Sequence, residues 1–202
     1  MLTVGLGGGH EITWASYLGI RAAFLNARLG IINLDAHFDN RPGAQATSGT
    51  GFAQIMETEA ERNVLVTTLG LAEASNTADL FDRARRAGIG WMTDDRWITY
   101  PVEAGRAEAQ LMEQSDIVYL TIDLDVLPAA VAPGVSAPAA YGVPLPLVSA
   151  VIDHVTASGK LVHADIAELN PGLDMDHRTA AVAARMVDRL TNVARARNMT
   201  TN

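Results

Sequence analysis

The sequence predicts an α/β fold with a parallel sheet, because short apolar segments alternate along the chain with longer segments of helical periodicity. A length of 202 residues with 49% hydrophobic content is enough for one domain, spanning 1–202, with a sizeable core. Strands are expected at 3–7, 30–35, 63–69, 89–92, 116–123 and 160–166. Helices are expected at 11–28, 50–60, 75–87, 103–114, 145–157 and 177–197.

Glycines mark the expected ends of three helices. Gly30 and Gly88 follow basic-ended helical segments, as C-cap glycines do, and the segment ASGK at 157–160 ends the fifth helix. The segment 124–144 contains four prolines and two glycines, which exclude a long regular element. A loop of that length in a compact domain is usually functional or disordered.

The composition excludes several classes of function. With 15 basic and 23 acidic residues the net charge is -8, which argues against nucleic acid or an anionic membrane as a partner and favours a cationic ligand. The absence of cysteine excludes disulfides, thiolate metal sites and cysteine nucleophiles. No signal peptide or transmembrane segment is evident, so we expect a cytoplasmic protein.

Charged residues stand at the ends of three expected strands. The first strand ends in GLGGGHE with His10, the second in NLDAHFD and the fifth in LTIDLDV. In an extended segment, residues two apart point to the same side, so each such group presents its ligating atoms together. The side chains concerned are those of His10, Asp35, His37, Asp39, Asp123 and Asp125.

Two divalent metal ions would explain this concentration of charge. Ligands of parallel α/β sheets bind beyond the carboxyl ends of the strands, and four aspartates converging there would repel one another without cations between them. His10 alone is more simply a loop histidine, and an isolated Asp-x-Asp pair such as Asp123 and Asp125 carries little information. The combination at three strand ends predicts a metal site.

The ordered motifs GGGHE, NLDAHFD, TIDLDVL and DIAELNP resemble those of the ureohydrolase family of arginases and agmatinases, over about residues 5–190. Within the family, DAHFD, SGTGFAQ at 48–54 and APGVSAPAAYGVP at 132–144 are most similar to the formimidoylglutamase branch. The resemblance implies a three-layer αβα fold with a largely parallel sheet. It also implies a chain that is shortened at its N-terminus, because family members carry further strands and helices before the GGGH motif.

The resemblance also implies two Mn²⁺ ions per subunit. His10, Asp35, Asp39 and Asp123 would hold one ion, and Asp35, His37, Asp123 and Asp125 the other, so that Asp35 and Asp123 bridge. Carboxylate and imidazole ligands without thiolate suit manganese.

The implied reaction is hydrolysis of N-formimidoyl-L-glutamate to L-glutamate and formamide, in histidine degradation. Glu168 of DIAELNP would bind the amidine group, and Asp125 would pass a proton to the leaving nitrogen. Arg41 is predicted to pair with a substrate carboxylate, helped by the hydroxyls of Ser48 and Thr50. The partners expected are thus a small-molecule substrate and, as a homo-oligomer, further copies of the chain.

Two alternatives stay open. One is an agmatinase-like or guanidinobutyrase-like ureohydrolase that releases urea, although Phe52 stands where arginases and agmatinases carry a histidine. The other is a truncated metal-binding remnant without turnover. The remaining histidines His154 and His163 are predicted to be structural, and His177 to begin the last helix.

Overall fold

The computed structural model describes residues 1–43, 45–59 and 63–200, with side-chain surroundings in the last helix described to residue 192. Six strands form one sheet in the order β1-β6-β5-β2-β3-β4, and all neighbouring pairs are parallel. Their bounds are β1 Thr3–Leu6, β2 Leu29–Leu34, β3 Val64–Leu71, β4 Gly90–Thr93, β5 Ile117–Asp123 and β6 Leu161–Ala167. Each predicted strand overlaps an observed one.

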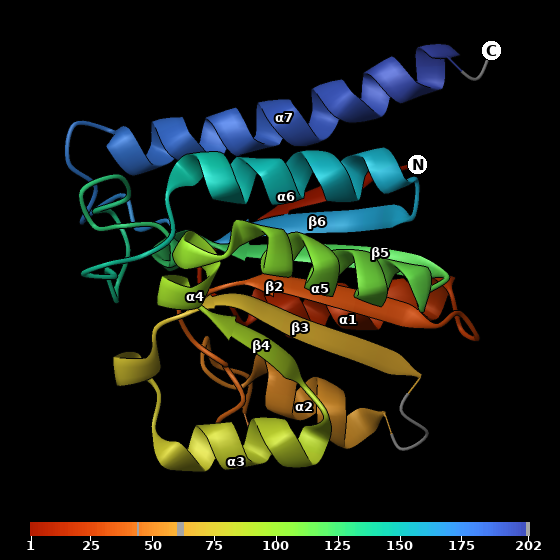
Figure 1. Cartoon of the computed structure of the whole chain (residues 1–202), viewed down its shortest axis with the longest axis horizontal. Coiled ribbons are helices and arrows are strands. Elements are labelled where there is room, and N and C mark those ends of the chain that lie inside the picture. Colours follow the sequence, from red (N-terminus) through yellow and green to blue (C-terminus); the bar gives the residue numbers. More distant parts are fainter. Residues whose placement is uncertain (44, 60–62, 201–202) are drawn as a thin grey trace.

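Helices cover both faces of the sheet, which confirms the predicted three-layer arrangement (Figure 1). The helices are α1 Ile12–Ala23, α2 Gly51–Thr58, α3 Ala78–Ala87, α4 Asp94–Thr99, α5 Pro101–Glu113, α6 Leu145–Ser158 and α7 Arg178–Thr200. Short 3-10 turns lie at Glu73–Ser75 and Leu124–Val126. Residue 60, the last of the predicted second helix, lies outside the described residues.

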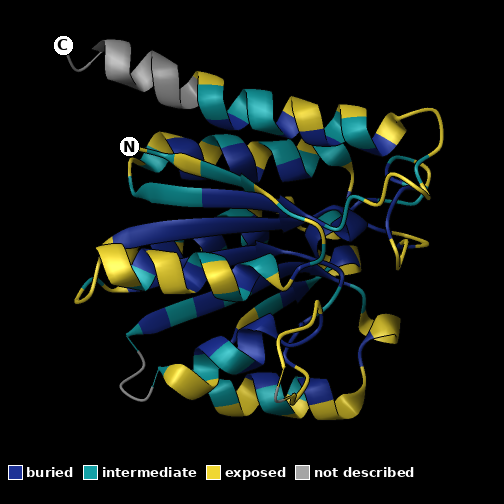
Figure 2. Cartoon of the chain, turned by 180° about the vertical axis from the view of Figure 1, so that it is seen from behind, coloured by how far each residue is buried: buried dark blue, intermediate teal, exposed yellow. Residues whose placement is uncertain are grey.

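Two hydrophobic cores lie on opposite faces of the sheet. Side chains of α1, α2 and α3 pack on one face, and those of α4, α5, α6 and α7 pack on the other. The alternation along β5 shows the division, because Tyr119 belongs to the first core and Leu120 to the second. The central strands β2 and β5 are wholly buried between these layers, whereas the edge strands β1 and β4 and the outer helix faces carry exposed residues (Figure 2).

Two of the three predicted helix ends agree with the structure. Gly88 and Gly159 are left-handed C-caps of α3 and α6, with φ of 73° and 80°. The prediction for Gly30 is wrong, because α1 already ends at Ala23 and Gly30 lies inside β2. A Cβ at Gly30 would lie 2.4 Å from Leu111 of α5, so glycine is needed there for close packing of helix and strand.

Strand β1 forms one edge of the sheet. The segment 124–144 is ordered, and an isolated bridge between Pro128 and Ala139 links its two halves. Among the described residues, no helix has both the length and the apolar character needed to cross a bilayer.

Candidate metal centre

The six predicted ligand side chains converge at the carboxyl end of the sheet. Among the described residues they form two groups, and within each group the ligand atoms all lie within 4.8 Å of one another. The first group comprises His10, Asp35, Asp39 and Asp123, and the second comprises Asp35, His37 and Asp125. Asp35 is shared by both groups, whereas Asp123 belongs to the first alone, so the bridging role of Asp123 stays a prediction.

The fold brings these residues together by strand register. Leu34 of β2 pairs with Ile122 of β5, so the residues that follow them, Asp35 and Asp123, lie side by side at the carboxyl end of the sheet. His10 lies in the short turn between β1 and α1. A Cβ at Gly7 would lie 2.8 Å from Ile12, so glycine at this position lets the chain pass close to the first residue of α1.

The geometry around His10 fits a cation. Its Nδ1 atom lies 3.1 Å from Asp35, 2.9 Å from Asp39 and 3.3 Å from Asp123, and the ring is only 1% exposed. One ring N–H can serve one strong hydrogen bond, yet three carboxylates crowd onto this atom. Ligands arranged round a positive ion show this pattern. Oxygen and imidazole nitrogen donors without thiolate are suited to manganese.

The electrostatics of the first group also require positive charge. Burial lowers the pKa of His10, but hydrogen bonds to Asp123, Asp35 and Asp39 outweigh it and raise that pKa well above its usual value. Burial and the charges of Asp125 and Asp35 raise the pKa of Asp123 well above its usual value. Burial and the Asp35 charge raise the pKa of Asp39 to about 6. These carboxylates therefore resist being ionised together without a cation.

The second group is more accessible. Nδ1 of His37 lies 3.0 Å from Asp125 and 3.7 Å from Asp35. Burial lowers the pKa of His37, but hydrogen bonds to Asp125 and Asp35 outweigh it and raise that pKa to about 11. A cavity of about 100 Å³ opens above the cluster, lined among others by His37, Asp125 and Glu168.

Glu168 is fixed at the edge of this cavity. Its carboxylate accepts hydrogen bonds from the His10 backbone N–H at 2.9 Å and from the Ser136 hydroxyl at 3.0 Å. Its backbone N–H donates to the carbonyl of Gly8 at 2.7 Å. Its φ is +70°, and that of Asp39 is +46°, so two residues of the site adopt a conformation that non-glycine residues rarely take.

The predicted substrate-contact residues separate into two sets. Arg41 and Ser48 line the cavity. The Thr50 side chain is instead buried in its own loop, where its hydroxyl accepts from the Thr47 N–H at 2.9 Å and donates to the Thr47 carbonyl at 3.1 Å. The structure thus gives Thr50 a role in holding the loop. Ser136, which also lines the cavity, was not predicted, because nothing in the loop sequence indicates its contact with Glu168.

Phe52 is the residue at which the family resemblance implies a histidine in arginases and agmatinases. It lies in α2, is 1% exposed and meets the His10 ring edge-to-face, with ring centroids 6.2 Å apart. A buried hydrocarbon ring cannot carry a proton.

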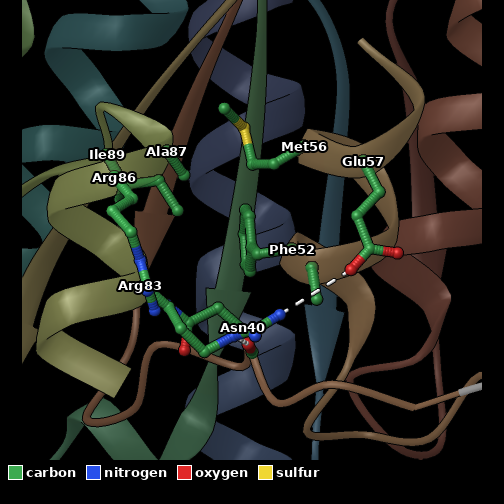
Figure 3. A pocket seen from close by; sticks show the side chains of 9 residues that line it. Asn40, Phe52, Met56, Glu57, Arg83, Arg86, Ala87 and Ile89 are labelled. Carbon is green, nitrogen blue, oxygen red and sulfur yellow. Dashed lines mark hydrogen bonds and ion pairs between the residues drawn. The ribbon is translucent and has the colours of Figure 1, made fainter. Parts of the chain in front are cut away.

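The loop that carries Asp39 is tied to α3 through Asn40. Nε of Arg83 donates to the Asn40 carbonyl at 2.8 Å, and the Asn40 amide donates to the Leu80 carbonyl at 3.0 Å. Figure 3 shows Arg83 beside Asn40 and pointing toward Glu57, in the wall of a cavity of about 390 Å³ between α2 and α3. These contacts help to hold the unusual backbone of Asp39.

We therefore expect Arg83→Met to weaken manganese binding several-fold, because it removes a charged hydrogen bond worth about 1.5–3 kcal/mol while keeping the aliphatic stem. Titration calorimetry measures the affinity. Arg85→Met is the matched control, since Arg85 lies on the same helix but its described contacts are with Asp82 and the Trp91 ring and not with Asn40. Equal affinities for both variants would contradict the expectation.

Comparison with known proteins identifies the family. A family model described as Arginase family matches residues 1–192. The chain belongs to the arginase family. One relative is the formimidoylglutamase of Nocardia farcinica, which is 54% identical over 187 residues that cover 91% of this chain and 59% of the relative. Another is the formimidoylglutamase of Ralstonia nicotianae, which is 51% identical over 199 residues that cover 94% of this chain and 61% of the relative. The chain thus spans about 60% of their length.

Solved structures of the family share the fold. Formimidoylglutamase from Bacillus subtilis superposes with a TM-score of 0.85 at 22% identity, covering 95% of this chain and 60% of that one. A manganese-containing formiminoglutamase of Trypanosoma cruzi gives 0.83 at 22% identity, with coverages of 94% and 64%. These likenesses confirm the arginase-like architecture predicted from the sequence.

Proposed function

We propose that this chain forms the manganese site of a formimidoylglutamase, which hydrolyses N-formimidoyl-L-glutamate to L-glutamate and formamide in histidine degradation. The observation that carries the proposal is the convergence of three buried carboxylates on Nδ1 of His10, beside a second group with His37. The curated relatives at about half identity support the choice of substrate within the family.

The residues of the cluster would hold two Mn²⁺ ions, one in each group. When bound, such a pair acts as a Lewis acid and lowers the pKa of water toward neutrality. Water adds to the formimidoyl carbon, the bond from that carbon to the glutamate nitrogen breaks, and a proton is transferred to that nitrogen. The Asp125 carboxylate, which lines the cavity, is the proposed carrier of this proton.

Glu168 is proposed to hold the amidinium of the substrate. Hydrogen bonds from the His10 backbone and the Ser136 hydroxyl keep its carboxylate beside the cluster, so it is oriented before substrate arrives. A charge-assisted pair between this carboxylate and the planar amidinium would place the formimidoyl carbon beside the metal ligands.

Phe52 favours this function over the urea-releasing alternative. Its buried ring leaves no histidine at the place where arginases and agmatinases have one. The remnant without turnover is the second alternative, because the chain spans about 60% of its relatives.

One assay separates the three functions. The manganese-loaded chain is offered formimidoylglutamate, arginine and agmatine, with formamide and urea measured separately. Formamide from formimidoylglutamate, lost on chelation, is expected. Urea from agmatine would support the alternative chemistry, and bound manganese without either product would support the remnant.

A further inference from the structure

A row of buried polar residues crosses the sheet directly beneath the metal ligands. Thr121 of β5 pairs in register with Asn33 of β2 on one side and with Asp165 of β6 on the other. All three are fully buried, with 0% exposure. Uncompensated polar groups at this depth are costly, so their hydrogen bonds show what the row does.

The row reaches the ligand Asp35 through Asn33 and the ligand His10 through Thr121. The Thr121 hydroxyl lies 2.8 Å from Nε2 of His10 and donates to Oδ1 of Asp165 at 2.6 Å. A threonine hydroxyl has one hydrogen, and Thr121 uses it in the hydrogen bond that Asp165 accepts. Thr121 is therefore left as an acceptor toward His10, so Nε2 must carry a hydrogen, and in the neutral ring that a metal ion would bind, Nδ1 is left with its lone pair.

The position of Asp165 is itself fixed from several sides. Tyr119 and Ser16 donate to Oδ2 at 2.5 Å and 2.7 Å, and Nε2 of His163 lies 3.6 Å from the same oxygen. Burial raises the pKa of Asp165, but hydrogen bonds with His163, Thr121, Tyr119 and Ser16 outweigh it, and the net effect is a lowered pKa. Asp165 is thus an ionised acceptor that cannot return a hydrogen to Thr121.

We propose that Asp165 is a positioning residue of the metal centre, which orients the Thr121 hydroxyl and thereby makes His10 offer Nδ1 to the first metal ion. The proposal rests on the metal site of the proposed function and adds a residue outside its ligand set. The hydrogen bond made by one ring nitrogen of a ligating histidine decides which form of the ring the metal meets.

The expected effect of Asp165→Asn follows from its chemistry. An asparagine of the same shape can donate to the Thr121 oxygen, which frees the Thr121 hydrogen to point at Nε2 of His10. The ring can then carry its hydrogen on Nδ1, where it blocks the metal. Manganese affinity measured by calorimetry is expected to fall about tenfold, the range found for partners of metal-bound histidines.

A double-mutant cycle tests the route of this effect. Thr121→Val should weaken manganese binding to a similar extent, and adding Asp165→Asn to it should cost no more than about twofold further, because the hydroxyl it acts through is gone. Thr121→Ser should restore the affinity. Tyr119→Phe is the matched control, since it removes another hydrogen bond to Asp165 and leaves Thr121 in place.

A second readout is the ring of His10 itself. In the chain loaded with diamagnetic Zn²⁺, long-range ¹H–¹⁵N spectra should show hydrogen on Nε2 in the unaltered protein and in Thr121→Ser, and a mixture in Asp165→Asn. Additive losses in the cycle, equal losses for Tyr119→Phe and Asp165→Asn, or an unchanged His10 spectrum would overturn the proposal and leave the proposed function standing. An unaltered chain that binds no manganese would overturn both.

Discussion

Asp35→Asn is expected to remove both manganese ions and to lower kcat/KM for formimidoylglutamate by at least about 10³-fold. Among the described residues Asp35 is the ligand common to both groups, and it is 0% exposed, so water cannot take its place. Two-metal activation of water contributes several kcal/mol, and a loss of about 4 kcal/mol corresponds to about 10³ in rate. Metal analysis of the purified chain and steady-state kinetics measure the two effects.

Asp125→Asn is the matched comparison for this prediction. It belongs to the second group alone, so one manganese per chain should remain in the first group. Asn33 and the His37 backbone donate to different oxygens of Asp35, so the single oxygen of an asparagine there keeps only one of these bonds, and circular dichroism is needed to check that both variants are folded. Two ions per chain and near-normal turnover in Asp35→Asn would disprove the shared-ligand assignment.

The strands and the ligands at their ends could be predicted for one physical reason. Parallel strands covered on both faces are continuous apolar segments, so the charge of Asp35 and Asp123 at their ends stands out. Their convergence follows because the carboxyl ends of parallel strands lie along one edge of the sheet.

The residues that sequence reasoning missed depend on distant parts of the chain. From sequence alone Gly30 is interpreted as a helix end, because its packing against α5 is not visible there. Helix α4 is too short to show helical periodicity; its N-cap is Thr93, whose hydroxyl accepts a hydrogen bond from the Arg96 N–H. Asp165 lies in a strand motif that draws attention to Glu168, and its contact with Thr121 appears only when β5 and β6 are placed in register.

Arg41 is the residue through which we predict the choice of substrate can be tested most directly. Its backbone N–H donates to the Gly49 carbonyl at 2.9 Å, and a Cβ on Gly49 would lie 2.4 Å from its guanidinium, so the side chain lies close over that glycine. The guanidinium is half exposed, lines the cavity above the metal ligands and lies 3.9 Å from Asp39. We therefore predict that it meets an anionic group of the proposed substrate, whose amidine is proposed to bind Glu168.

Arg41→Ala is expected to lower kcat/KM for formimidoylglutamate by about 10- to 150-fold, because a charge-assisted pair with a substrate carboxylate contributes about 1.5–3 kcal/mol. Arg41→Lys should recover part of this loss, since a point charge cannot make the two parallel hydrogen bonds of a guanidinium. Bound manganese should stay unchanged in both variants, which separates a substrate contact from a damaged metal site. Carboxylate-free agmatine serves as the control substrate, and any turnover of it should not depend on Arg41. If Arg41→Ala changes kcat/KM by less than about twofold, the carboxylate is bound elsewhere.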